Sequence, residues 1–160
     1  MDDHLSVSRF LFGEKPSSAD FAIYGQLTQL IGFDPTSRRI ASENSLRLVS
    51  WVDVMADLSG HDVNNSNWTS LEDSPPSLKE IMKEFGQMYV PALLANAKAI
   101  MEGDETWETE IDGSTWKQKA FPYQAKCLKW IKEEFNTLSK NDKTRIKTFL
   151  EGTGCEAILD

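Results

Sequence analysis

Residues 10–27, FLFGEKPSSADFAIYGQL, decide which fold the chain is expected to adopt. Ser17 and Asp20 stand three residues apart, directly before an apolar run. In a capping box, the serine hydroxyl accepts a hydrogen bond from the backbone N–H three residues on, and the acidic side chain there reaches back to the N–H of the serine. The pattern therefore predicts a helix that starts at Ser17, runs to about Ile31 and ends at Gly32.

Four further helices are expected from apolar residues at helical spacing and from their start and stop signals. Ser77 with Glu80, and Ser139 with Asp142, form a second and a third capping box. Pro91 lacks a backbone donor and clashes with the preceding turn, so it predicts a kink or two abutting helices near residues 86–91. The four helices are expected over about 44–60, 77–101, 122–138 and 139–151.

The stretch TWETEIDGSTWKQK, residues 106–119, has the two-residue period of β-strands. Asp112-Gly113 is a preferred two-residue hairpin turn. This register puts Trp107 and Trp116 on one face, and it pairs Glu108 with Lys117 on the other. Because a lone hairpin is only marginally stable, its tryptophan face is expected to pack on helices. Five helices and one small β-hairpin at about 106–119 make the expected fold all-α, a mainly helical bundle.

Composition and charge narrow the function classes. The chain has 160 residues, of which 40% are hydrophobic and 26% charged, and its formal net charge is −8. This charge argues against attraction to nucleic acid or to anionic membranes. No stretch approaches the roughly 20 apolar residues of a membrane span, and the acidic start does not look like a signal peptide. Cys127 and Cys155 form no CxxC pair, so we expect free thiols in a reducing, cytoplasmic compartment.

The FLFG lead-in, the capping box at 16–20 and the aromatic-rich helix after it resemble the core helix start in the C-terminal domain of glutathione transferases. The resemblance covers roughly residues 5–60 and includes the later helix around Trp51. Residues 61–160 are similar to an extended C-terminal region of some bacterial glutathione-transferase-like proteins. The resemblance thus implies a helical core over 1–60 and a helical extension with the hairpin over 61–160, packed as one single domain.

In that family, a separate thioredoxin-like domain binds glutathione, and the helical domain forms the apolar side of the substrate cleft. The resemblance implies that Ser17 and Asp20 are structural, and that this chain holds no catalytic or cofactor-binding residue. With His4 and His61 as the only histidines and no His/Cys cluster, we expect no metal-binding residue either. It implies that the chain is inactive alone and that its partner is a thioredoxin-like N-terminal domain or another subunit, with a homodimer as one outcome. The alternative is a stand-alone protein–protein interaction module of the same fold.

Several other features could carry chemistry, and each also has a structural explanation. Tyr24, Tyr89 and Tyr123 could line a substrate pocket, although tyrosines at helical spacing more often pack at the edge of a core. Cys127 is expected to be buried and inert, and Cys155 in the tail to be the more reactive thiol. Ser59-Gly60-His61-Asp62 is expected to be a loop, because a catalytic triad is assembled from separated segments.

The basic residues are also unevenly placed. Residues 117–147 hold nine Lys or Arg, and Lys126, Lys129 and Lys132 fall on one helical stripe. A nucleic-acid surface would use such a stripe. Neutralisation by the acidic stretch 102–112 is the preferred interpretation, because no aromatic platform interleaves the lysines in the sequence.

Overall fold

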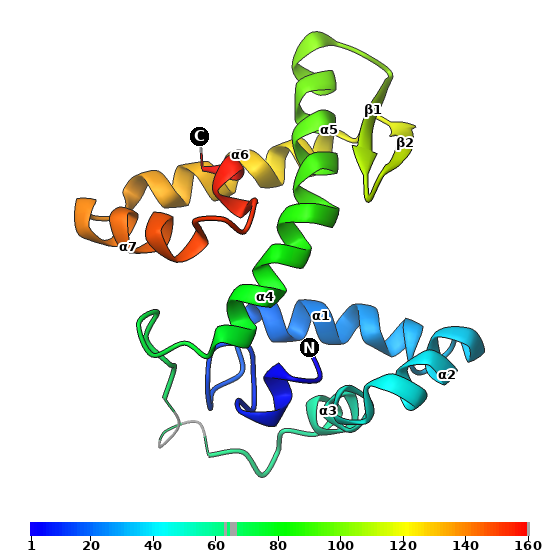
Figure 1. Ribbon diagram of the computed structural model, residues 1–160, viewed down its shortest axis with the longest axis vertical. Coiled ribbons are helices and arrows are strands. Elements are labelled where there is room, and N and C mark those ends of the chain that lie inside the picture. Colours follow the sequence, from blue (N-terminus) through cyan, green and yellow to red (C-terminus); the bar gives the residue numbers. More distant parts are fainter. Residues whose placement is uncertain (63, 65–66, 160) are drawn as a thin grey trace. The chain divides into compact units, whose positions relative to one another are not determined.

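The computed structural model describes the whole chain except residues 63, 65–66 and 160. It is mainly helical with one antiparallel hairpin, which confirms the expected fold class at that level (Figure 1). Contacts within the chain divide it into two compact units, Met1–Leu78 and Lys79–Asp160.

The first unit contains a short 3₁₀ helix and three α-helices. Its core consists of Phe10, Ile31, Trp51, Val52 and Met55. The trace passes from the 3₁₀ helix through an irregular lead-in to α1, and two tight connections join the remaining helices. These elements are η1 (His4–Ser6), α1 (Ser18–Leu30), α2 (Pro35–Asn44) and α3 (Leu46–Ala56).

Helix α1 starts where the sequence predicted. Ser17 is the N-cap residue in extended conformation, and both halves of the capping box with Asp20 are present. The helix ends at Leu30, and the backbone N–H of Ile31 still donates to the Leu27 carbonyl. The sequence-based prediction of this helix is confirmed to within one residue at each end.

Helix α2 was not expected from the sequence. None of its residues is buried, so it carries no apolar stripe for the helical period to reveal. Its start signal is present: Asp34 accepts a hydrogen bond from the Ser37 N–H at 2.7 Å, and Pro35 occupies the first turn. Proline is favoured there because the first helical N–H groups have no intrahelical acceptor.

The expected capping box at Ser77 is not formed. Helix α4 (Pro76–Glu84) starts one residue earlier, so Ser77 lies inside it. The Ser77 hydroxyl lies 2.9 Å from Nδ1 of the buried His4, and the Glu80 carboxylate pairs with Lys83 at 2.7 Å. A long-range partner has thus replaced the local cap.

The second unit continues α4 into a π-helical turn and a long helix, followed by the hairpin and two helices. The expected disturbance before Pro91 is this π-helical turn: the Val90 N–H donates to the Phe85 carbonyl, five residues back. Pro91 then lies in the first turn of the next helix, where its missing N–H is tolerated. The elements are η2 (Phe85–Tyr89), α5 (Val90–Glu102), β1 (Thr106–Ile111), β2 (Ser114–Lys119), α6 (Pro122–Thr137), α7 (Lys140–Leu150) and η3 (Cys155–Ile158).

The hairpin has the predicted register. Glu108 lies opposite Lys117, and Thr109 lies opposite Trp116. Asp112 and Gly113 both have positive φ, 50° and 70°, as a type I′ turn requires. Strand β1 packs against α5, and the two elements run side by side in Figure 1. The tryptophan face therefore packs on a helix, as expected.

Candidate functional sites

The Asp20 side chain of the first unit is fully buried, and its carboxylate accepts hydrogen bonds from two separate segments. One carboxylate oxygen accepts from the Leu11 backbone N–H at 2.8 Å. The other accepts from the backbone N–H of Ser17 at 2.8 Å and from its hydroxyl at 2.6 Å. An ordinary capping box holds only the start of its own helix. Here the same carboxylate also holds the chain nine residues earlier.

The lead-in before α1 is held from a second side. Gly13 has φ +116°, a conformation that L side chains rarely adopt, and it forms bridges with Phe10 and Trp68. The Thr69 N–H donates to the Phe12 carbonyl at 2.8 Å. The FLFG lead-in is therefore a fixed turn, and its glycine is required by the backbone.

A groove with a volume of about 390 Å³ lies on the first unit, between the N-terminal segment and α3. Trp51 lies at its base and donates its indole N–H to the Arg9 carbonyl at 3.2 Å. Leu46 and Val54 are exposed beside it, whereas Arg47 is paired with Asp2 at 2.9 Å. The groove is lined by Leu5, Ser8, Arg9, Leu46, Arg47, Ser50, Trp51 and Val54. Its surface can accept an apolar partner.

A second, more aromatic cavity with a volume of about 300 Å³ lies wholly within the second unit. It is formed by the π-helical turn, the start of α5, the inner face of the hairpin and the start of α6. We call it the aromatic cavity. Its lining residues are Met88, Tyr89, Ala92, Leu93, Trp107, Ile111, Trp116, Gln118 and Gln124.

Two contacts hold the walls of the aromatic cavity in place. The fully buried Asn96 of α5 donates to the Phe121 carbonyl at 3.0 Å and accepts from the Phe121 N–H at 2.7 Å, which ties the start of α6 to α5. Gly86 in the π-helical turn packs directly on the backbone of Thr153. Neither Asn96 nor Gly86 was predicted to have this role, because a single Asn or Gly in a helical pattern does not indicate which distant residue it contacts.

The three tyrosines singled out from the sequence have different surroundings. Tyr89 lines the aromatic cavity. Burial is the main cause that raises the pKa of its hydroxyl, and the neighbouring Cys127 thiol raises it further, so the hydroxyl remains a donor at neutral pH. Tyr24 packs against the core of the first unit. Tyr123 is exposed, and its ring lies 6.3 Å from that of Trp130, edge to face. Only Tyr89 lines this cavity.

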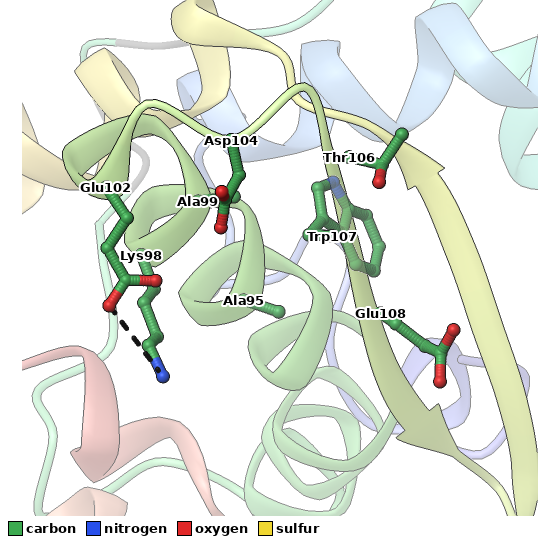
Figure 2. Close-up of a pocket in the computed structure, with 8 residues that line it drawn as sticks. All are labelled: Ala95, Lys98, Ala99, Glu102, Asp104, Thr106, Trp107 and Glu108. Atoms are coloured by element: carbon green, nitrogen blue, oxygen red, sulfur yellow. Dashed lines mark ion pairs between the residues drawn. The ribbon is translucent and has the colours of Figure 1, made fainter.

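A smaller, more polar cavity of about 200 Å³ lies beside the C-terminal half of α5, and Trp107 lines both this cavity and the aromatic cavity. Figure 2 shows Lys98 and Glu102 paired along the helix, with nitrogen and oxygen 4.0 Å apart, and Asp104 and Glu108 beyond them. Within the described residues, no group of three or more His, Cys, Asp or Glu side chains could hold a metal ion.

The two cysteines are not arranged as expected. Cys155 is buried, donates its thiol to the Met82 carbonyl at 3.1 Å, and has a pKa that burial raises. Cys127 is only partly buried. The expectation that Cys155 is the more reactive thiol is therefore wrong, because the tail folds back as η3 and covers it. In the 59–62 loop, the His61 ring packs edge-on against Phe10, with ring centroids 5.4 Å apart.

The basic stripe of α6 is neutralised partly within its own helix. Lys129 pairs with Glu133 at 3.6 Å. The Lys126 ammonium lies 4.7 Å from the centre of the Trp130 ring, a cation–π contact. An aromatic ring thus does accompany these lysines, although no aromatic platform was apparent in the sequence.

Comparisons with family models, with curated proteins and with solved structures found no match to this chain. In the part of the chain that the structure describes, none of the helices is both long and apolar enough to cross a bilayer.

Proposed function

We propose that this chain is the C-terminal helical half of a glutathione-transferase-like protein. On this proposal a thioredoxin-like domain binds glutathione, and the helical half supplies an apolar surface for the electrophilic substrate. The arrangement around Asp20 carries the proposal. Its carboxylate joins the FLFG lead-in, through Leu11, to the capping serine of α1, so the two parts of the motif that resembles the family form one buried unit.

The chemistry assigned to this chain is binding and orientation. In a thiol transfer, the nucleophile is the sulfur of glutathione, and a neighbouring group must stabilise its thiolate. We assign that group to the thioredoxin-like domain and no catalytic step to this chain. A cytoplasmic location fits the two cysteines, both of which are free thiols.

Glutathione resin and a conjugation assay test this proposal. The chain alone is expected to pass through immobilised glutathione and to give no conjugation of glutathione with 1-chloro-2,4-dinitrobenzene. Retention on the resin that free glutathione reverses would contradict the proposal, because the chain would then hold the glutathione site itself. The reading frame upstream of Met1, or an adjacent gene, is expected to encode a strand-rich thioredoxin-like domain. Restored conjugation after that domain is joined to this chain is the positive outcome.

The second candidate function is a protein interaction module that associates with itself. The groove on the first unit favours it, because Leu46 and Val54 expose apolar surface beside Trp51. Sedimentation equilibrium is expected to show a dimer that Val54→Lys dissociates. A monomer at every concentration would contradict this second candidate and leave the first in place.

A further inference from the structure

We propose that the aromatic cavity is a binding site for a small, planar, uncharged aromatic molecule that carries one polar substituent. The site lies in the second unit, so the inference goes beyond the proposed transferase role, which is argued from the first unit.

The size and walls of the cavity determine the shape of the ligand. A volume of about 300 Å³ is at the lower end of the range for small-molecule sites, which suits one or two fused rings. Three aromatic side chains, Tyr89, Trp107 and Trp116, line it. Aromatic rings contact one another best in offset-stacked or edge-to-face geometry, so such walls favour a flat aromatic molecule over a bulky saturated one.

The polar groups of the cavity determine the charge of the ligand. No Asp, Glu, Lys, Arg or His belongs to its lining. A charged ligand would lose water there and find no ionised side chain to pair with in the lining, which favours an uncharged ligand. Tyr89, Gln118 and Gln124 belong to the lining, and neither the Tyr89 hydroxyl nor the two side-chain amides form a hydrogen bond among the described residues. These groups can bind a hydroxyl or carbonyl substituent.

Trp107 gives the site a rigid wall. It is only 5% exposed, between α5 and the hairpin. Its indole Nε1 is buried and has no hydrogen-bond partner in the described part of the chain. The π-helical turn that positions Tyr89 is also typical of functional sites.

Calorimetric titration of the full chain with 2-naphthol tests the proposal, and decahydro-2-naphthol serves as the saturated control. We expect saturable binding of 2-naphthol at one site, and binding of the saturated alcohol about tenfold weaker or undetectable. Trp116→Ala is expected to weaken binding by about tenfold, because one stacking wall is lost. Trp116 is 49% exposed, so its truncation leaves the core of the second unit in place.

The matched control is Trp130→Ala. Trp130 has a similar exposure, 44%, but does not line the cavity, so its truncation is expected to leave the affinity within about twofold. Tyr89→Phe keeps the ring and removes the hydroxyl, and it should weaken binding roughly threefold without lowering the unfolding midpoint. No saturable binding, equal binding of the two alcohols, or equal loss in the Trp116 and Trp130 variants would each overturn the proposal. Because glutathione is not present, failure here leaves the transferase proposal untouched.

Discussion

At the scale of single residues, one sequence motif has two different roles in this chain. Ser17 with Asp20 and Ser139 with Asp142 have the same spacing, and each serine caps its helix. Asp142 is partly exposed, and it bonds to the Ser139 hydroxyl and to Arg145. Asp20 is fully buried and also binds Leu11. Because Asp20 is buried and also accepts a hydrogen bond from the Leu11 N–H, we expect the stability of the first unit to depend on it.

Replacing Asp20 should therefore cost much more than replacing Asp142. Asp20→Ala leaves the backbone N–H groups of the buried Leu11 and the partly buried Ser17 without their acceptor, and we expect it to lower the free energy of unfolding by roughly 3 kcal/mol. Asp142→Ala removes a surface cap interaction and should cost about 1 kcal/mol or less. Urea unfolding followed by circular dichroism measures both changes. Equal losses would show that Asp20 acts only as an ordinary cap.

At the scale of elements, the second unit is organised around the π-helical turn and α5. The turn brings Gly86 against the backbone of Thr153, so the C-terminal segment packs on it closely. Helix α5 contacts the π-helical turn, β1, α6 and η3. Substitutions at these contacts test how the aromatic cavity is held.

Gly86→Ala should destabilise the second unit. A Cβ at this position would fall on the Thr153 carbonyl oxygen, so the C-terminal segment has to move. We expect a loss of roughly 1–3 kcal/mol in the free energy of unfolding. The control is Gly25→Ala in α1, where a Cβ meets no atom within 4 Å and should stabilise the helix by about 0.5–1 kcal/mol. The thermal unfolding midpoint is expected to fall in Gly86→Ala and to rise in Gly25→Ala. Shifts of the same sign in the two variants would contradict the close approach of Gly86 to the Thr153 backbone.

Asn96→Leu tests the connection between α5 and α6. Leucine has a similar size but leaves both the N–H and the carbonyl of Phe121 without their partner. We expect a loss of roughly 2–4 kcal/mol and faster hydrogen exchange of the Phe121 amide. Asn136→Leu on the exposed side of α6 is the control and should change stability by no more than about 0.5 kcal/mol. An unchanged Phe121 amide in Asn96→Leu would contradict the assigned role.

At the scale of the whole molecule, stability should be greatest near neutral pH and fall on both sides. Hydrogen bonds from Ser59, Ser139 and the backbone around Glu156 lower the pKa values of Asp57, Asp142 and Glu156, respectively. A carboxyl group with a lowered pKa in the folded state stabilises the fold above its unfolded pKa. That stabilisation is lost as the pH falls through the folded pKa, below about pH 4.

The alkaline side has the opposite sign. Burial raises the pKa values of the Cys155 thiol and the Tyr89 hydroxyl, so the fold favours their protonated forms. Stability should therefore fall as the pH rises through those values, above about pH 9. Urea midpoints measured from about pH 3 to about pH 10 check both sides. A midpoint that rises continuously toward either extreme would contradict the assignment.

Short stretches of sequence specify the local features: the starts of α1 and α7, the interruption before Pro91, and the hairpin with its turn and register. Each depends on groups a few residues apart, such as Ser17 with Asp20 or Asp112 with Gly113, so a short window of sequence contains the whole interaction. The side of the hairpin that packs on a helix also followed from the two-residue period. Asp34 and Pro35 are a start signal for α2 in the sequence. Because no residue of this helix is buried, however, its apolar residues show no helical period that would have predicted it.

The pairs of groups that meet across long stretches of sequence depend on how the elements pack. Ser77 bonds to His4 instead of capping α4, Asn96 holds Phe121, and the folded tail buries Cys155. Of the three tyrosines, it is Tyr89 that lines the aromatic cavity, a site whose other walls come from α5, the hairpin and α6. The physical reason is that these partners are tens of residues apart in sequence. Their pairing depends on how whole helices and the hairpin pack, which local periodicity does not specify.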